Sequence, residues 1–275
     1  MRSIRQAYRQ FLNTQHGADV YRCFKRILYS DRDSLVTTLH RSVLPRIAAT
    51  RQERVKLCDI GGGDGARLEH IVTRLHDMFD NEYEADFVEQ SAIYAADFAR
   101  RMKPPSLTAR VHGALFEDVA LPAASYDIVF LIHSIFAFAN GAAIEKVLAL
   151  PRCGGNAIVV SNAGDSFLAG LKRLVDADFN DARYEISDLA LSLEVHGVTF
   201  STQTFDTSWE ITNQEWTGAA SIILDWISLG RYETFEKRRK REIVEYLYDQ
   251  STPTRAGRAF RETEVVLVLS PKSVS

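Results

Sequence analysis

Three glycines spaced two residues apart form the part of the sequence best suited to hold a ligand. Gly61, Gly63 and Gly65 stand between an apolar segment, 55–60, and a segment with helical periodicity, 66–78. A glycine has no Cβ, so the backbone of such a loop can approach a ligand closely and adopt positive φ angles. The pattern indicates a nucleotide-like cofactor, and close packing of a helix on a strand is the alternative explanation.

The charges around this loop distinguish between cofactors. Asp59 and Asp64 flank the glycines, and carboxylates at this position would repel the pyrophosphate of a dinucleotide. S-adenosylmethionine has no phosphate; it carries an ammonium group and a sulfonium, which carboxylates stabilise. The loop therefore favours S-adenosylmethionine over NAD, with S-adenosylhomocysteine as the product. Asp64 is also suited to cap the following helix.

The ends of the next two strands supply further candidate cofactor contacts. Glu89 follows a strand expected at 85–88, with Gln90 beside it. A carboxylate at this place can accept both hydrogen bonds of a ribose diol. The alternative is that Glu89 is an ordinary solvated carboxylate at the end of a strand. Phe116 and Glu117 follow the third expected strand. They are placed to stack on an adenine and accept its amine, and a surface turn explains them equally well.

His133 is the candidate catalytic residue. It stands with Ile132 at the end of an apolar segment, 126–133, and the carboxyl ends of parallel strands form the edge where open α/β sheets bind ligands. Histidine titrates near neutral pH, so His133 is suited to accept a proton from a reacting group. A hydrogen bond that positions the cofactor is the alternative role.

Strands and helices alternate over most of the chain, which predicts an α/β fold with parallel crossovers. The spacing of residues 212–215 is that of a capping box and predicts a helix start at Thr212. We divide the chain into an N-terminal helical cap, 1–50, and one domain, 51–275, with a helical insertion at about 206–262. The expected strands are 55–60, 85–88, 108–112, 126–133, 157–161, 198–205 and 264–269. Two helices are expected within 4–28, and another begins at 92 and ends before the prolines at 104 and 105. The other expected helices are 66–78, 142–150, 165–177, 187–196 and 212–229.

Composition and charge narrow the class of protein. The 275 residues carry a net charge of −3, so we do not expect a nucleic-acid partner. Cys23, Cys58 and Cys153 lack the spacing of a metal site, and no bound metal is expected. The sequence has no apolar run of signal-peptide or membrane-spanning type, so we expect a cytoplasmic protein without a membrane partner.

These residues resemble the class I methyltransferase family, most closely histamine N-methyltransferase and its relatives. The resemblance rests on segments 8–13, 60–65, 88–92 and 126–136 and covers most of the chain. It implies a Rossmann-like fold with a mostly parallel seven-stranded sheet, helices on both faces and an N-terminal helical extension. Carried over residue by residue, it implies cofactor contacts at Gly61, Glu89, Ile132 and His133.

The same resemblance implies a substrate pocket that includes Tyr8, Phe11 and Phe136, to which His16 and Phe167 are added as candidates. Two departures argue against histamine as the substrate. The glutamate of the histamine enzyme falls here at about Gly17, and its asparagine before the last strand is replaced within 261–263.

The function expected is methyl transfer to a small-molecule acceptor, with nitrogen as the first choice. Such a transfer is an in-line displacement, for which a protein mainly aligns the reacting atoms and excludes water. Transfer to oxygen or carbon, and a non-catalytic cofactor-binding protein of the same fold, remain open alternatives.

Overall fold

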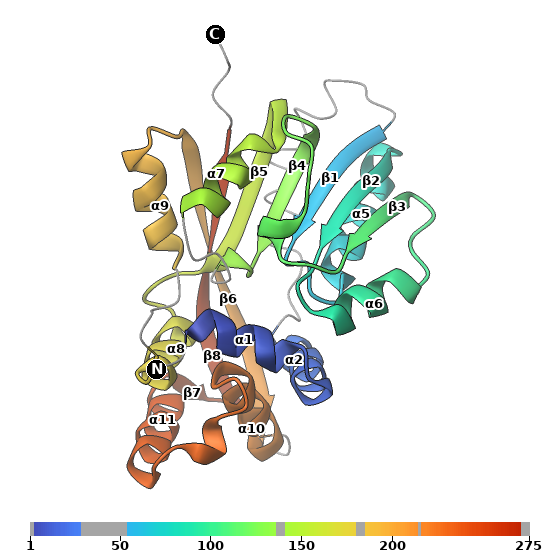
Figure 1. Ribbon diagram of the computed structural model, residues 1–275. Helices are drawn as coiled ribbons and strands as arrows, with labels where there is room; N and C mark the ends of the chain where they lie inside the picture. The colour runs from blue at the N-terminus through green and yellow to red at the C-terminus, as the bar shows by residue number, and fades with distance from the viewer. Residues whose placement is uncertain (1–2, 29–53, 136–140, 180–184, 214–215, 271–275) are drawn as a thin grey trace.

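The computed structural model describes residues 3–28, 54–135, 141–179, 185–213 and 216–270, and Figure 1 shows their arrangement. Within these ranges, eight strands form one sheet, and seven of them follow the order β3-β2-β1-β4-β5-β8-β6, with β7 paired beside β8. The strands are β1 (Arg54–Ile60), β2 (Glu82–Val88), β3 (Leu107–His112), β4 (Tyr126–Ile132), β5 (Pro151–Asn162), β6 (Phe200–Thr212), β7 (Ser251–Pro253) and β8 (Gly257–Leu269).

The strand directions confirm the expected α/β class. β1 to β5 pair in parallel, and β8 is antiparallel to both β5 and β6. Parallel strands covered on both faces have continuous apolar sequences, and β4 is buried at every position except its last. The expected row of seven mostly parallel strands in a Rossmann-like order is therefore confirmed.

Helices cover both faces of the sheet, as expected. Leu68 and Ile71 of α5 pack with Phe98 of α6 on one face, whereas Val147 of α7 packs with Leu189 of α9 on the other. In the described ranges, no helix combines the length and the hydropathy needed to cross a bilayer. The helices are α1 (Ile4–Leu12), α2 (Gln15–Leu28), α5 (Ala66–Phe79), α6 (Ala92–Arg100), α7 (Gly141–Ala149), α8 (Phe167–Asp176), α9 (Ile186–Val195), α10 (Trp216–Ile227) and α11 (Lys237–Asp249).

The last two long strands differ from the sequence-based expectation. The strand expected at 198–205 continues to Thr212, and the strand expected at 264–269 begins at Gly257. The predicted helix start at Thr212 is wrong, because Thr212 pairs with Gly257 at the end of β6 and α10 begins at Trp216. Pairing between β6 and β8 along their full length outweighs the local capping signal, and the resulting ribbon extends past the parallel strands.

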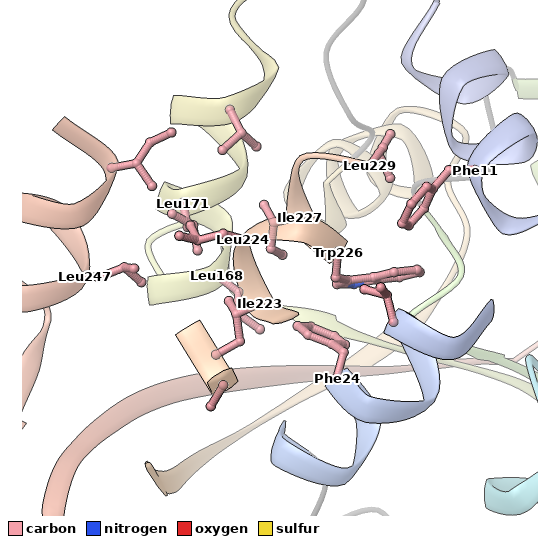
Figure 2. Packing of buried hydrophobic residues seen from close by; sticks show 14 of the residues in the cluster. Phe11, Phe24, Leu168, Leu171, Ile223, Leu224, Trp226, Ile227, Leu229 and Leu247 are labelled. Carbon is pink, nitrogen blue, oxygen red and sulfur yellow. The ribbon is translucent and has the colours of Figure 1, made fainter. Parts of the chain in front are cut away.

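The helices α1 and α2 form a cap that packs against α10, which comes from the other end of the chain (Figure 1). The centre of this packing is Trp226, whose ring lies 4.5 Å from Tyr21, 5.4 Å from Phe24 and 5.6 Å from Tyr8 between ring centroids. Figure 2 shows Trp226 and Phe24 among the leucines and isoleucines of this core. The cap is therefore held by a hydrophobic core of its own, which also includes α8 and α11.

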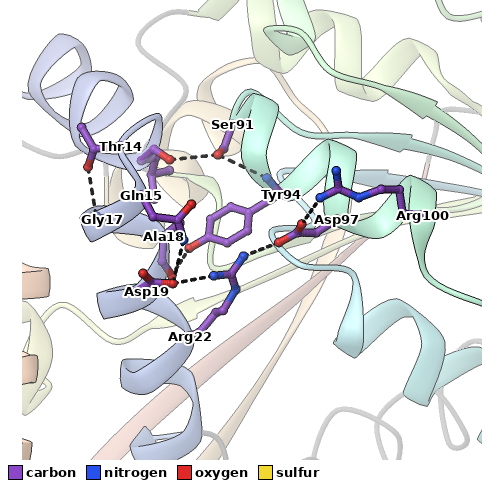
Figure 3. A network of polar contacts seen from close by, with 11 residues as sticks. Thr14, Gln15, Gly17, Ala18, Asp19, Arg22, Ser91, Tyr94, Asp97 and Arg100 are labelled. Atoms are coloured by element: carbon purple, nitrogen blue, oxygen red, sulfur yellow. Dashed lines mark hydrogen bonds and ion pairs between the residues drawn. The ribbon is translucent and has the colours of Figure 1, made fainter.

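Polar contacts fix the cap to α6 as well (Figure 3). The Tyr94 hydroxyl donates to the carbonyl of Ala18 at 2.7 Å, and Arg22 forms an ion pair with Asp97. The Ser91 hydroxyl donates to the carbonyl of Leu12 at 2.9 Å. Because α6 directly follows the end of β2, these contacts place the cap over the carboxyl edge of the parallel strands.

Candidate functional site

The glycine loop leaves β1 with backbone angles that require glycine. Gly61, Gly63 and Gly65 have φ values of 72°, 61° and 74°. A Cβ on Gly61 would lie 2.5 Å from the Cβ of Ser134, and a Cβ on Gly65 would lie 2.1 Å from the Phe98 ring. Both the left-handed conformation and the available space therefore exclude larger residues at these two positions.

Glu89 is held against this loop by two backbone groups. The amide of Gly63 donates to Glu89 Oε2 at 2.8 Å, and the amide of Ser91 donates to Oε1 at 2.7 Å. Burial raises the pKa of Glu89, and these backbone hydrogen bonds oppose that rise. Each carboxylate oxygen can accept more than one hydrogen bond, so Glu89 keeps the capacity to bind a pair of hydroxyl groups.

Two further carboxylates flank the glycines in different environments. Burial raises the pKa of Asp59 to about 7. Burial also acts to raise the pKa of Asp64, but the ammonium of Lys25, 2.5 Å from Asp64 Oδ1, the amide of Ala66 and the charge of Arg101 together outweigh it and lower that pKa. Lys25 lies on α2, so the cap contributes a positive charge to the edge of the glycine loop.

Two adjoining cavities open beside the loop. They share Gly61, Gln90 and Ser134, so together they form one elongated cleft along the carboxyl edge of β1, β2 and β4. The first cavity is lined by Tyr8, Leu12, Tyr21, Gly61, Gly63, Glu89, Gln90, Tyr94, His133 and Ser134. The second is lined by Arg5, Ile60, Gly61, Val88, Gln90, Ala114, Leu115, Phe116, Glu117 and Ser134.

The second cavity ends at Phe116 and Glu117. The Phe116 ring is buried, and the ammonium of Lys146 lies 4.6 Å from its centre on one side. Glu117 forms an ion pair with Arg5 of α1, so the cap reaches this end of the cleft too. An apolar ring and a carboxylate therefore lie together at this end of the cleft.

His133 stands where β4 ends, next to the first cavity. Its backbone amide donates to the carbonyl of Val160 at 2.8 Å, and its φ of 53° is in the left-handed region, which is uncommon outside glycine. Its Nε2 lies 2.9 Å from Oε1 of Glu264 on β8. Burial lowers the pKa of His133, and the hydrogen bond with Glu264 acts in the opposite direction.

The structure brings most of the expected cofactor residues together. The residues that line the cavities are Gly61, Gly63, Glu89, Gln90, Phe116, Glu117 and His133. Gly65 completes the loop, Asp59 is the last but one residue of β1, and Ile132 is the last residue of β4; these three are not among the lining residues.

The expected substrate residues are more dispersed. Tyr8 lines the first cavity, whereas Phe11 packs on Trp226 and Phe167 packs on Phe260 within the core. His16 is largely exposed and pairs with Asp225 at 2.7 Å. Phe136 lies outside the described residues.

Sequence reasoning missed Arg5, Tyr21, Tyr94 and Ser134 as cleft residues. Ser134 directly follows His133, and its hydroxyl donates to the carbonyl of Ile60 at 2.7 Å, which ties the end of β4 to the glycine loop. Its position after a strand was a usable signal. Arg5 and Tyr21, on α1 and α2, gave no such signal, because the place of these helices depends on packing against distant segments.

Comparison with known proteins supports the fold. No model of a known protein family matches the sequence, and neither does any curated protein. Among solved structures, the plantazolicin methyltransferase BpumL, solved with a desmethyl plantazolicin analogue and S-adenosylhomocysteine, aligns over 98% of this chain and 95% of its own at 12% identity and a TM-score of 0.57. BamL, also solved with S-adenosylhomocysteine, aligns over 98% and 96% at 13% identity and a TM-score of 0.53.

A phosphoethanolamine N-methyltransferase of Haemonchus contortus, solved with phosphomonomethylethanolamine and S-adenosylhomocysteine, gives a TM-score of 0.57 at 12% identity. The alignment covers 96% of this chain and 60% of that longer protein. At these identities the comparisons establish the fold, which is the Rossmann-like fold of class I methyltransferases.

Proposed function

We propose that this protein is an S-adenosylmethionine-dependent methyltransferase that acts on a small-molecule acceptor. The observation that carries the proposal is the cleft at the carboxyl edge of β1, β2 and β4, in which the buried carboxylate of Glu89 faces the glycine loop. Similar folds have been solved with S-adenosylmethionine or S-adenosylhomocysteine bound.

The chemistry of the lining fits the parts of this cofactor. Glu89 can accept hydrogen bonds from a ribose diol, and Phe116 with Glu117 suits an adenine at the second cavity. We assign the stabilisation of a positively charged group to Asp59, whose carboxyl group is buried beside Gly62 of the glycine loop. Lys25 pairs with Asp64 at the edge of the loop, and we assign to Lys25 the carboxylate of the ligand as a second partner. A zwitterionic amino acid attached to a nucleoside satisfies all of these groups.

When bound, the cofactor supplies a methyl group activated by a sulfonium. The chain's own part is to align the acceptor, exclude water through the cap, and accept a proton. We assign proton acceptance to His133, which lines the first cavity together with residues of the glycine loop. A nitrogen acceptor is the first choice, supported by the resemblance to the histamine N-methyltransferase family and by the N-methyltransferase among the similar structures. We further propose a cytoplasmic protein without a nucleic-acid partner, consistent with its net charge of −3.

Isothermal titration of the full-length protein with S-adenosylmethionine, S-adenosylhomocysteine and NAD tests the cofactor. Glu89→Gln should weaken binding of both sulfur compounds by about 10- to 100-fold, because a charged acceptor of two hydrogen bonds is lost. Glu84→Gln is the matched control, since Glu84 is on β2, the strand that Glu89 directly follows, but pairs with Arg54 away from the cleft. Binding of NAD with no response to the sulfur compounds would overturn the proposal. Turnover is then sought with labelled cofactor and a panel of amines and phenols.

A further inference from the structure

The interaction between His133 and Glu264 is built from segments far apart in the sequence. Glu264 lies on β8, which pairs with β5, and β5 pairs with β4, the strand that ends just before His133. The imidazole therefore reaches past β5 to contact a carboxylate on the next strand, at 2.9 Å. The His133 and Glu264 side chains are only 11% and 14% exposed, so water does not compete strongly for this contact.

We propose that Glu264 is a positioning residue that holds His133 in the tautomer protonated at Nε2, which makes Nδ1 the proton acceptor of the site. The inference rests on the proposed function for its chemical meaning and deepens it. A carboxylate near Nε2 accepts a hydrogen bond from a protonated Nε2, and a neutral imidazole then has its lone pair on Nδ1. The left-handed backbone at His133 and its amide hydrogen bond to Val160 fix the base of the side chain.

The surrounding charges favour an ionised Glu264 and a neutral His133. Burial acts to raise the pKa of Glu264, but the hydrogen bond from His133, the charge of that imidazole when protonated and the charge of Arg67 together outweigh it, and that pKa lies below its ordinary value. For His133, burial is the largest influence and lowers the pKa, Glu264 raises it, and the cations Arg67 on α5 and Lys172 on α8 lower it further. A neutral imidazole that donates to a carboxylate is the result.

The lone pair of the acceptor nitrogen forms the bond to the methyl carbon, and the electron pair of the methyl–sulfur bond stays with sulfur. The proton of the acceptor nitrogen passes to Nδ1 of His133, which becomes an imidazolium stabilised by Glu264 and later loses that proton to solvent.

Nitrogen NMR of the full-length protein labelled at histidine tests the tautomer without turnover or cofactor. The His133 signals are assigned by their loss in His133→Asn. The expected result in the wild type is a proton on Nε2 and none on Nδ1. In Glu264→Gln the amide can donate or accept, so the fixed tautomer should be lost, and the pKa of His133 should fall because a negative charge that stabilised the imidazolium is gone.

Two variants keep this test decisive. Glu264→Asp retains a carboxylate acceptor, so His133 should keep the Nε2 proton at least in part. This variant tests the inference even if Glu264→Gln folds poorly. Glu262→Gln, on the same strand two residues away, should leave the tautomer unchanged, because Glu262 contacts the backbone of Leu168. A proton on Nδ1 in the wild type, or an unchanged His133 in Glu264→Gln, would overturn the inference.

Binding and rate measurements separate this inference from the proposed function. Cofactor affinity of Glu264→Gln should stay close to that of the wild type, because Glu264 does not line the cleft, while kcat should fall by about 10- to 100-fold. A wild type that binds no sulfur cofactor would contradict the proposed function and leave the tautomer result standing. A Glu264→Gln protein with the wild-type kcat would contradict the positioning role alone.

Discussion

The two halves of the molecule that meet at the cleft are built in different ways. The glycine-loop half, β1 to β4 with α5 and α6, is made of elements that pack mainly against their neighbours in sequence. The cap half joins α1 and α2 to α8, α10 and α11 and to the outer parts of β6 and β8. The cofactor side of the cleft is therefore formed by segments that are close in the sequence. The side that would receive an acceptor forms only when both ends of the chain come together.

The largest effect on stability is expected for substitution of Trp226, and it should be confined to the cap half. Trp226→Ala removes a ring that packs on Tyr8, Tyr21 and Phe24, and it should lower the free energy of unfolding by about 3–5 kcal/mol. Hydrogen exchange should show lost protection in α1, α2 and α10, with β1 and β4 largely unchanged. Trp226→Phe is the control and should cost less. Equal loss of protection in both halves would remove the distinction.

The second prediction concerns the glycine-loop half. Gly65→Ala adds a Cβ at a φ of 74° where it would meet Phe98, and it should cost about 3 kcal/mol. Gly154→Ala has a similar φ of 80° but open space around it, so only the backbone strain of about 1 kcal/mol applies. Urea unfolding of both variants measures the difference. Similar losses would mean that Phe98 moves aside and that the loop is less closely packed than described.

The smallest effect is expected in the pH dependence of the free energy of unfolding, to which each half should contribute through one carboxyl group. Burial raises the pKa of Asp59 to about 7, while an unfolded aspartate titrates near pH 4. Between these values the folded state binds more protons, so the free energy of unfolding falls as pH rises, by about 2.5 kcal/mol from pH 5 to pH 8. Asp59→Asn should abolish this part of the fall in urea titrations at the two pH values.

Glu262 provides the same signature in the cap half. Burial also raises its pKa to about 7, and its carboxylate accepts the amide of Leu168 in the first turn of α8. Glu262→Gln should therefore reduce the fall in stability across the same pH range. A pH dependence identical to the wild type in both variants would show that neither carboxyl keeps its proton near neutral pH.

The sequence predicted the glycine-loop half well because its signals are local. The spacing of Gly61, Gly63 and Gly65 between an apolar strand and an amphipathic helix, with Glu89 ending the next strand, corresponds directly to the observed cleft. The alternation of strands and helices was enough to predict the sheet and the edge at which the polar residues gather.

The cap half was less predictable because tertiary contacts override local preference there. The capping spacing at Thr212 favoured a helix, but pairing with Gly257 places it in a strand. Aromatic residues such as Phe11 and Phe167 were expected in a pocket and instead pack in a core, which no single-sequence pattern distinguishes. The partnership of His133 with Glu264 was equally hidden, since it depends on the strand order.

The position of β8 has a consequence for synthesis. β8 is the last of the sheet strands in chain order, yet it lies between β5 and β6, which were translated earlier. Until β8 leaves the ribosome, the nascent chain carries two long strands with unpaired backbone groups, the kind of surface on which chains associate wrongly. Chaperones can keep such edges apart until the final strand inserts. We therefore expect this protein to depend on chaperones more than a protein whose sheet is completed in sequence order.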